Sequence, residues 1–395
     1  MEKLIYMDNA ATTPVRAEVL DNIIPYFTTK YGNASSVYKL GQSSKKAVEA
    51  AREQVANALG ADVSEIYFTA GGSESDNWAL RGVTEALKEK GNHIITTKIE
   101  HHAILHTSQY LEQIGFEVTY LPVDKYGKVS INELEAAIRP TTILISVMTA
   151  NNEIGTVEPI AEIGEIAHKH GIIFHTDAVQ AVGHVPIDVN KMNIDLLSLS
   201  GHKLGAPKGI GAIYIRKGTK INQLIFGGAQ ERKRRAGTEN VPAIVGLGKA
   251  IELANEEMED EVKRLVLLRD KLINGIMKAI PYSRLNGHPT DRLPGNCNIS
   301  FAFVEGESVL MLLDMNGICA SSGSACTSGS LDPSHVLLAL GLKHEEAHGS
   351  VRFTLGYETT DEDVDYVLEK LPPIIERLRS MSPLYEDYIN GKDNA

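Results

Sequence analysis

Long apolar runs, paired cysteines and an excess of basic residues are all missing from this sequence. No apolar run approaches the ~20 residues that a membrane-spanning helix needs. The first residues show neither the apolar block of a signal peptide nor the arginine-rich pattern of a transit peptide. The three cysteines form no Cys-x-x-Cys pair and no even set for disulfide bonds, which is typical of a reducing compartment. We therefore expect a soluble cytoplasmic protein without a membrane partner.

The charge balance argues against nucleic acid as the main partner, because 39 Lys and Arg face 51 Asp and Glu for a net charge of −12. No Gly-x-Gly-x-x-Gly follows an apolar run, so the fingerprint of a nicotinamide enzyme is absent as well. At 395 residues the chain exceeds one ordinary core, and two domains are expected.

Short apolar runs alternate with segments of helical periodicity through the first 280 residues. This alternation predicts a mainly parallel sheet with helices on both faces and ligands at the carboxyl ends of its strands. After Pro281 the units become shorter and indicate a smaller α+β domain. We expect strands at 66–69, 93–97, 116–121, 142–148, 172–176, 194–199 and 211–215, and helices at 44–59, 103–114, 131–138, 159–170 and 240–280.

A glycine-rich turn follows the first of these strands. Gly71-Gly72-Ser73 leads into a helix that we expect to open with a capping box of Ser73 and Asp76. Bare amides at a helix N-terminus, together with the helix dipole, can hold an anion. An ordinary strand-to-helix turn explains the same residues equally well.

A lysine stands where another strand runs into a second glycine-rich turn. Residues 200–211 read Ser-Gly-His-Lys-Leu-Gly-Ala-Pro-Lys-Gly-Ile-Gly, and the lysine is Lys203. A partly desolvated amine beside anion-binding groups can hold an aldehyde cofactor as a Schiff base. The alternative is a surface lysine in a hairpin loop.

Several polar side chains follow other predicted strands. Asp177 could pair with a protonated pyridine nitrogen, or it could be a solvated turn residue. His101 could stack on a flat ring or transfer protons, although adjacent histidines also have surface and capping roles. Asn152 places an amide at the same sheet edge. Arg352 lies in a strand-like run, where its guanidinium would meet a substrate carboxylate or an internal acid.

The segment 321–330 is the most unusual in the chain, because a single cysteine, Cys326, stands among small residues without apolar periodicity. This composition predicts a mobile loop whose thiol acts as a carrier or nucleophile. Cys297 and Cys319 lie in apolar strand contexts and are expected to be structural. The basic run 231–238 indicates a solvated loop, or one that reaches across a subunit boundary to a phosphate.

Taken together, these motifs resemble the cysteine desulfurases of the NifS/IscS family, within the class V aminotransferase superfamily. The resemblance covers nearly the whole chain and is most specific at the lysine and cysteine motifs. It implies a pyridoxal 5'-phosphate (PLP)-dependent transferase of fold type I, α/β in class, with a mainly parallel seven-stranded sheet domain and a smaller α+β domain. It rests on DNAATTPV, GNASS, TAGGSESDN, EHHAIL, NNEIG, HTDAVQ, SGHKLGAPKGIGA, RAGT, VEGES, SSGSACTSGSLDPSHVL and SVRFTLG.

The resemblance also implies domain limits and a set of site residues. The large PLP-binding domain would span residues 15–258, and residues 1–14 and 259–395 would form the small domain with the catalytic loop 321–330. Lys203, His101 and Cys326 would be catalytic. PLP would be held by Gly72, Ser73, His101, Asn152, Asp177, Gln180, Ser200, His202 and Lys203, with Thr238 supplied by the other subunit of a homodimer; Asn33, Asn152 and Arg352 would bind the substrate.

The implied reaction converts L-cysteine to L-alanine. Lys203, assisted by His101, would remove the α-proton, and the Cys326 thiolate would take the substrate sulfur as a persulfide. An iron–sulfur scaffold protein would accept the sulfur, and Cys326 could be a transient cluster ligand in that complex, without a resident metal. A selenocysteine lyase or another class V enzyme of the same fold is the alternative, and a non-catalytic sulfur-carrier protein is a further one.

Overall fold

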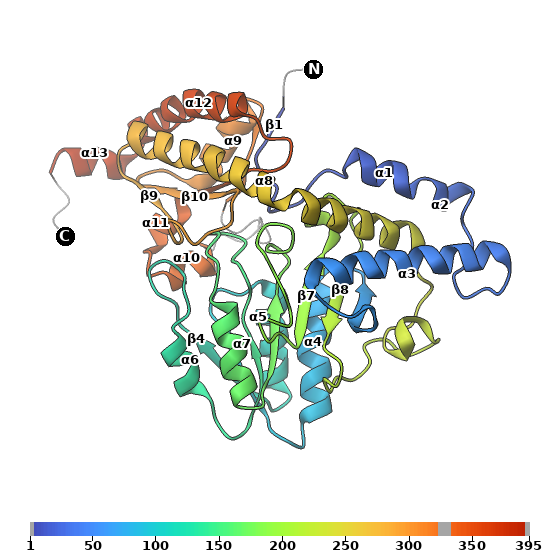
Figure 1. Cartoon of the computed structure of the whole chain (residues 1–395). Helices are drawn as coiled ribbons and strands as arrows, with labels where there is room; N and C mark the ends of the chain where they lie inside the picture. Colours follow the sequence, from blue (N-terminus) through green and yellow to red (C-terminus); the bar gives the residue numbers. More distant parts are fainter. Residues whose placement is uncertain (1–3, 323–332, 392–395) are drawn as a thin grey trace.

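A seven-stranded sheet lies at the centre of the larger part of the molecule (Figure 1). The computed structural model describes residues 4–322 and 333–391. The sheet order is β2-β8-β7-β6-β5-β3-β4, in which β8 runs antiparallel to both neighbours and the other pairings are parallel. Its strands are β2 (Ile66–Thr69), β3 (His93–Thr97), β4 (Glu117–Leu121), β5 (Thr142–Ser146), β6 (Ile173–Asp177), β7 (Leu196–Ser200) and β8 (Gly211–Ile215). The expected fold class is confirmed.

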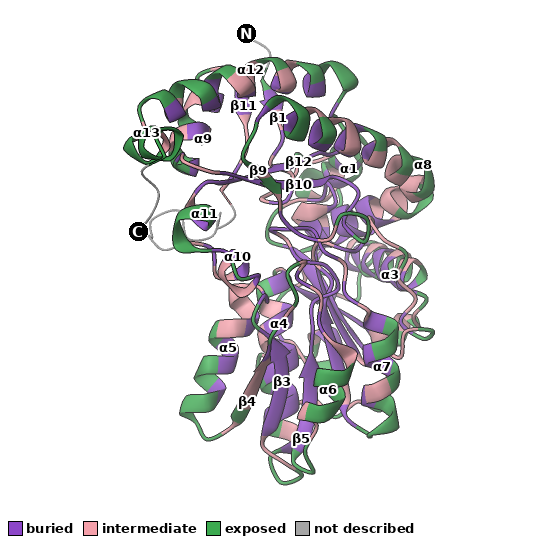
Figure 2. Ribbon diagram, turned by 90° about the vertical axis from the view of Figure 1, so that its left-hand side faces the viewer, coloured by how far each residue is buried: buried purple, intermediate pink, exposed green. Residues whose placement is uncertain are grey.

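Helices cover both faces of this sheet, which is why its central strands are apolar at successive positions rather than at alternate ones. On β7, for example, Leu196 and Leu197 are both fully buried, and they belong to separate apolar clusters on the two faces. Figure 2 shows the central strands as the buried interior, whereas the edge strand β4 is only partly buried. The surrounding helices are α1 (Ala17–Ile23), α2 (Pro25–Thr28), α3 (Lys39–Leu59), α4 (Gly72–Leu87), α5 (His102–Gln113), α6 (Ile131–Ala137) and α7 (Ile160–Lys169).

A second apolar core lies in the smaller part of the molecule. Strand β10 (Asn296–Phe301) pairs with β9 (Ser283–Leu285) and β12 (Ser350–Thr354), all antiparallel. Strand β1 (Ile5–Tyr6) pairs in parallel with β11 (Ile318–Cys319), so the start of the chain belongs to this core. The helices here are α9 (Gly306–Asp314), α10 (His335–Ala339), α11 (His344–His348), α12 (Asp361–Ser380) and α13 (Pro383–Ile389).

The long helix α8 (Val241–Ala279) connects the two parts (Figure 1). Its first turns bury residues such as Leu247 in the core of the large sheet, and its last turns bury residues such as Leu272 in the second core. The proposed division at residue 258 falls inside this continuous helix, and it stays a prediction. Within the described ranges, no helix is long and apolar enough to cross a membrane.

Candidate active site

Lys203 follows β7 directly, in a short 3-10 helix from Gly201 to Lys203, and its side chain is part-buried. Its ammonium donates to the carbonyl oxygens of Ala10 (2.5 Å) and Ala11 (2.7 Å). The amide of Gln180 donates to the same Ala10 carbonyl at 3.0 Å. The N-terminal arm therefore crosses the carboxyl edge of the sheet beside the lysine, so the alternative of an exposed hairpin lysine is not supported.

Asp177 ends the neighbouring strand β6 and is buried, with one carboxylate oxygen accepting from the Val179 amide at 2.9 Å. Burial raises the pKa of Asp177 to about 6, while the Val179 amide and Lys203 act in the opposite direction. A cationic partner would therefore stabilise the charged carboxylate strongly, as a protonated ring nitrogen would.

A second carboxylic acid, Asp76, lies buried beneath the same edge. Its Oδ1 is 3.7 Å from Nε2 of His175, whose imidazole bridges the hydroxyls of Ser146 (2.9 Å) and Ser198 (3.0 Å). Burial raises the pKa of Asp76 well above its ordinary value. Burial also lowers the pKa of His175 to about 3, so this imidazole is neutral near pH 7.

The expected capping box at Ser73 and Asp76 is wrong. Helix α4 begins at Gly72 with Gly71 as its N-cap, and the structure shows no side-chain hydrogen bond to that cap. Asp76 instead points towards the sheet, because α4 packs its apolar and small residues there. The first amides of α4 are therefore left for another acceptor.

Two glycines give this turn its shape. Gly71 has φ +156°, in a region that favours glycine. A Cβ on Gly72 would lie 2.5 Å from Cγ2 of Val179. Ser200 ends β7 on the same side, since its Cβ would be 3.6 Å from that added atom. Ser200 and the start of α4 thus form one small polar cradle, and His202 lies at the same strand end with Nδ1 3.2 Å from the Thr12 hydroxyl.

His101 caps helix α5, where its Nδ1 accepts from the Ala103 amide at 3.1 Å. Burial, and then the charge of Lys203, lower the pKa of His101, so the imidazole is neutral near pH 7, and its proton lies on Nε2 because Nδ1 accepts from the Ala103 amide. His101 and Ser73 line an open hollow of 610 Å³. His102 and His106 on α5 have a His-x3-His spacing that the sequence analysis did not single out. Their ring centroids lie 4.9 Å apart.

Arg352 lies on β12, fully buried, and donates to Asp8 Oδ1 (3.0 Å) and to the Asn152 carbonyl (2.9 Å). The ion pair with an internal acid, which was the alternative to a substrate carboxylate, is therefore present. The acid is Asp8, which the sequence analysis did not single out. Its Nε is buried without a hydrogen-bond partner in the described part of the chain. A buried unpaired donor of this kind calls for an acceptor, and a small carboxylate would supply one.

Three predicted residues are not placed against this cluster. Asn33 is exposed in the loop before α3, and its Oδ1 accepts from the Ser35 amide at 2.8 Å. Thr238 is exposed at the end of a loop that Arg235 holds to α4 through Glu74 at 2.9 Å. Cys326 lies outside the described residues. The roles of all three stay predictions.

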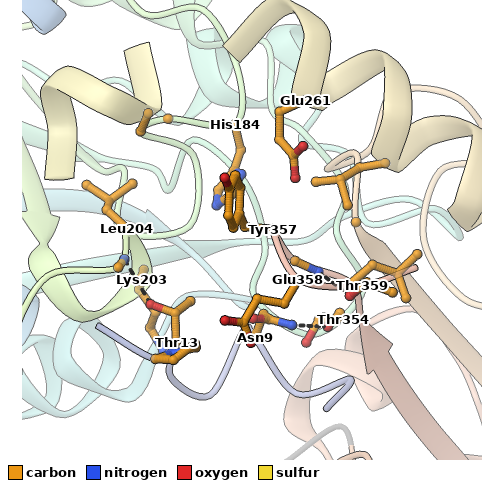
Figure 3. A pocket seen from close by; sticks show the side chains of 18 of the residues that line it. Asn9, Thr13, His184, Lys203, Leu204, Glu261, Thr354, Tyr357, Glu358 and Thr359 are labelled. Atoms are coloured by element: carbon orange, nitrogen blue, oxygen red, sulfur yellow. Dashed lines mark hydrogen bonds between the residues drawn. The ribbon is translucent and has the colours of Figure 1, made fainter. Parts of the chain in front are cut away.

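Lys203 and Gln180 also line a cavity of 480 Å³ between the two parts of the molecule. Figure 3 shows His184, Tyr357 and Glu261 around it, with Lys203 and Thr13 at one side. Over residues 4–322 and 333–391, no group of three histidine, cysteine or acidic side chains could hold a metal ion.

These residues together fit the groups of PLP. The cradle of Gly72 and Ser200 offers amides and a hydroxyl where the terminal phosphate would bind, and a Cβ at Gly72 would fill space there. Lys203 supplies a primary amine at the same sheet edge, and Asp177 supplies a buried acid that a cation would stabilise. The donor set therefore matches a phosphate, an aldehyde and a basic ring nitrogen.

Comparisons with known proteins agree with this chemistry. Residues 5–367 match the family model described as aminotransferase class-V. The chain is 63% identical to "Cysteine desulfurase IscS" of Methanosarcina thermophila over 97% of this chain and 94% of that protein. It is 60% identical to the protein of the same name from Clostridium botulinum over the full length of both. Among solved structures, it resembles a "NifS-like protein" (TM-score 0.90, 40% identity, 95% and 100% covered) and "SspA in complex with cysteine" (TM-score 0.80, 40% identity, 89% and 98% covered).

Proposed function

This chain belongs to the class-V aminotransferase family, in its cysteine desulfurase branch, and we propose that it removes sulfur from L-cysteine with PLP and leaves the sulfur as a persulfide on Cys326. The observation that carries this proposal is the convergence of the Lys203 amine, the buried Asp177 and the Gly72–Ser200 cradle at one sheet edge. The relatives of the chain, which are 60% and 63% identical to it over nearly their whole length, are named for the same activity.

PLP, when bound, supplies an electron sink for the bonds around the substrate α-carbon. Lys203 would hold it through the side-chain amine and afterwards take the α-proton. Asp177 would hold a proton at the ring nitrogen, because burial makes the charged carboxylate costly without a cation. His101 would cover the ring face, and Asn152 would contact both ring and substrate. Gly72, Ser73, Ser200 and His202 would hold the phosphate, and Gln180 the ring hydroxyl.

L-cysteine would be oriented by its carboxylate at Arg352. The buried Nε of this arginine is a donor without an acceptor in the described chain, and its two terminal nitrogens are already fixed by Asp8 and Asn152. The substrate thiol would then face the segment that carries Cys326. The Cys326 thiol needs a base to ionise near neutral pH. His101 would take that proton at Nδ1 once this atom is released from the Ala103 amide.

A homodimer, an iron–sulfur scaffold as sulfur acceptor and a cytoplasmic location complete the proposal. Exposed apolar side chains on α1, α2 and the loop that follows support association with a second copy; they are Leu20, Ile24, Phe27, Tyr31 and Val37. Asn33 lies in the same loop, and the exposed Thr238 is available to a second copy.

Two variants test the proposal. Lys203→Ala should lose the visible absorbance of the purified protein and its sulfide release from L-cysteine. Cys326→Ser should keep the absorbance and yet form no protein persulfide, as measured by mass spectrometry of the intact chain. Normal turnover in either variant would contradict the proposed roles, and activity on selenocysteine alone would favour a lyase.

A further inference from the structure

The loop that ends at Thr238 is anchored to its own subunit by a buried ion pair. The carboxylate of Glu231 accepts from both terminal nitrogens of Arg52 on α3, at 2.8 and 3.0 Å, and both side chains are buried. The same carboxylate accepts from the Phe68 amide on β2 at 3.0 Å. The base of the loop is therefore fixed to β2, the strand that leads into the Gly71–Gly72 turn.

Three consecutive residues of this anchor have a left-handed backbone. Glu231, Arg232 and Lys233 have φ angles of 44°, 55° and 66°. Each of them has a Cβ, so the conformation is costly and persists only where surrounding contacts impose it. Arg232 adds two such contacts, because its guanidinium donates to the carbonyls of Ile66 (3.0 Å) and Val63 (3.1 Å). The ion pair and these hydrogen bonds thus hold a strained turn in one conformation.

One glutamine connects the strained turn to the end of the loop. Gln230 precedes Glu231, and its side-chain oxygen accepts from the Gly237 amide at 3.3 Å. A Cβ on Gly228 would lie 2.5 Å from the same oxygen, so the glutamine side chain also packs closely against the start of the loop. Gly237 is followed directly by Thr238. The residue expected at a partner's phosphate is therefore next to a backbone group that Gln230 fixes.

A second tie lies closer to Thr238. The guanidinium of Arg235 donates to the carboxylate of Glu74 on α4 at 2.9 and 3.3 Å. The loop is thus held to both elements that the Gly71–Gly72 turn joins, β2 at its base and α4 near its end. Thr238 itself is exposed, and it lies apart from the cluster around Lys203 of its own subunit. A fixed loop with an exposed hydroxyl at its end suits a site on a second copy of the chain.

We propose that Gln230 and Glu231 are positioning residues that act across the subunit boundary, by holding Thr238 of one subunit in place for the cofactor phosphate of its partner. A hydroxyl forms a charge-assisted hydrogen bond with a phosphate oxygen, and a loop fixed beforehand loses little entropy when that bond forms. Ile225 and Phe226 in the same loop are exposed, as expected of a surface that a second copy covers. This inference rests on the proposed function, since it takes PLP as the cofactor and a homodimer as the assembly.

The affinity for PLP measures this positioning without turnover. PLP is removed from the purified protein and titrated back while the visible absorbance is followed. Thr238→Ala and Gln230→Ala should each raise the dissociation constant about tenfold, the scale of one hydrogen bond to a charged group. The double variant should be no weaker than Thr238→Ala alone, because Gln230 acts through Thr238. Gln230→Glu, which keeps an acceptor for the Gly237 amide, should bind PLP as the native protein does.

Two further variants test the strained turn and the specificity of the effect. Glu231→Gln removes the charge that pairs with Arg52, and it should weaken PLP binding in the same way. The added change Lys233→Gly should recover part of the affinity, because glycine adopts a positive φ without strain. Gln54→Ala is the matched control, since the Gln54 amide joins α3 to Glu252 on α8 at 2.9 Å; it should leave the affinity unchanged.

Mixed dimers show in which subunit Gln230 acts. Two chains with different affinity tags are expressed together, and the dimers that carry both tags are purified. One chain carries Lys203→Ala, so that only the site of the other chain gives the visible absorbance. With Gln230→Ala on the Lys203→Ala chain, the remaining site should bind PLP about tenfold more weakly. With Gln230→Ala on the other chain, that site should keep its affinity within about twofold.

Several results would overturn the inference. They are native affinity in both Gln230→Ala and Glu231→Gln, the reverse pattern in the mixed dimers, an equal loss in both arrangements, and a native protein that is a monomer. Sulfide release from L-cysteine is measured on the same preparations. A native protein that shows the expected pattern of PLP binding but releases no sulfide would refute the proposed function and leave the positioning role intact.

Discussion

Replacing Arg352 with lysine tests the carboxylate site most directly. The guanidinium spans Asp8 and Asn152 with its two terminal nitrogens and leaves Nε for a third acceptor. Lysine keeps the positive charge beside Asp8, so this half-buried acid is not left unpaired, but the single nitrogen of lysine cannot reproduce the planar fork. The change therefore removes the carboxylate contact with limited loss of stability.

The expected magnitude follows from that one contact. A hydrogen bond to a charged group contributes about 1.5–3 kcal/mol, and every 1.4 kcal/mol is a factor of about ten in a dissociation constant. Arg352→Lys should therefore raise the inhibition constant of L-alanine against L-cysteine turnover by roughly 10- to 100-fold. The inhibition constant of ethylamine, which has the amine but no carboxylate, should stay within about twofold, because it makes no charged contact with the guanidinium.

The comparison of the two inhibitors is what makes the result decisive. Equal weakening of L-alanine and ethylamine would show that the substitution damaged the site as a whole. Unchanged inhibition by L-alanine would show that Arg352 serves only the ion pair with Asp8. The thermal midpoint of the variant, measured beside the native protein, checks that the fold is retained.

Two further substitutions test the cradle and the buried layer beneath it. Gly72→Ala should weaken PLP binding by tenfold or more, on the order of one lost charged hydrogen bond, because the new Cβ would meet Cγ2 of Val179 at 2.5 Å. The added change Val179→Ala should restore much of the binding, as measured by titration of the visible absorbance. If it does not, the defect lies elsewhere than in this contact. His175→Asn should reduce the loss of stability on acidification. Burial holds the pKa of His175 at about 3 against 6.5 in the unfolded chain, so below pH 6.5 the unfolded state alone gains a proton. Between pH 6.5 and 5 this protonation lowers the free energy of unfolding of the native protein by about 2 kcal/mol. Urea unfolding of the native protein and of the variant at both pH values measures the effect. An equal dependence of the unfolding free energy on pH in the two proteins would contradict the assignment.

The sequence predicts the fold and the local chemistry of the site well where both depend on short segments. The seven strands are predicted because their apolar runs are short, rich in branched residues and separated by turns. Lys203 and Asp177 are recognisable since each follows such a run, and the carboxyl ends of parallel strands meet at one edge. The alternation of strands and helices along the sequence is enough to place these two side chains at the same edge of the sheet.

Contacts between distant segments are beyond this kind of prediction. Asp8 and Arg352 are 344 residues apart, and no period or spacing links them. Ser334 and Glu153 meet only because the smaller part packs on the large sheet. Asp76 has the spacing of a capping box, yet the packing of α4 on the sheet places it in the interior. Tertiary burial decides all three positions.

The second core has a consequence for biosynthesis. It joins Ile5 and Met7 to Val364 and Ile375, which are synthesised long after them. The large sheet can assemble while translation continues. Strand β1 is apolar and stays unpaired until β11 and α12 have been synthesised. A nascent chain of this protein therefore exposes the apolar residues of β1 until β11 and α12 have been synthesised, and factors that shield emerging peptides should matter most for its yield.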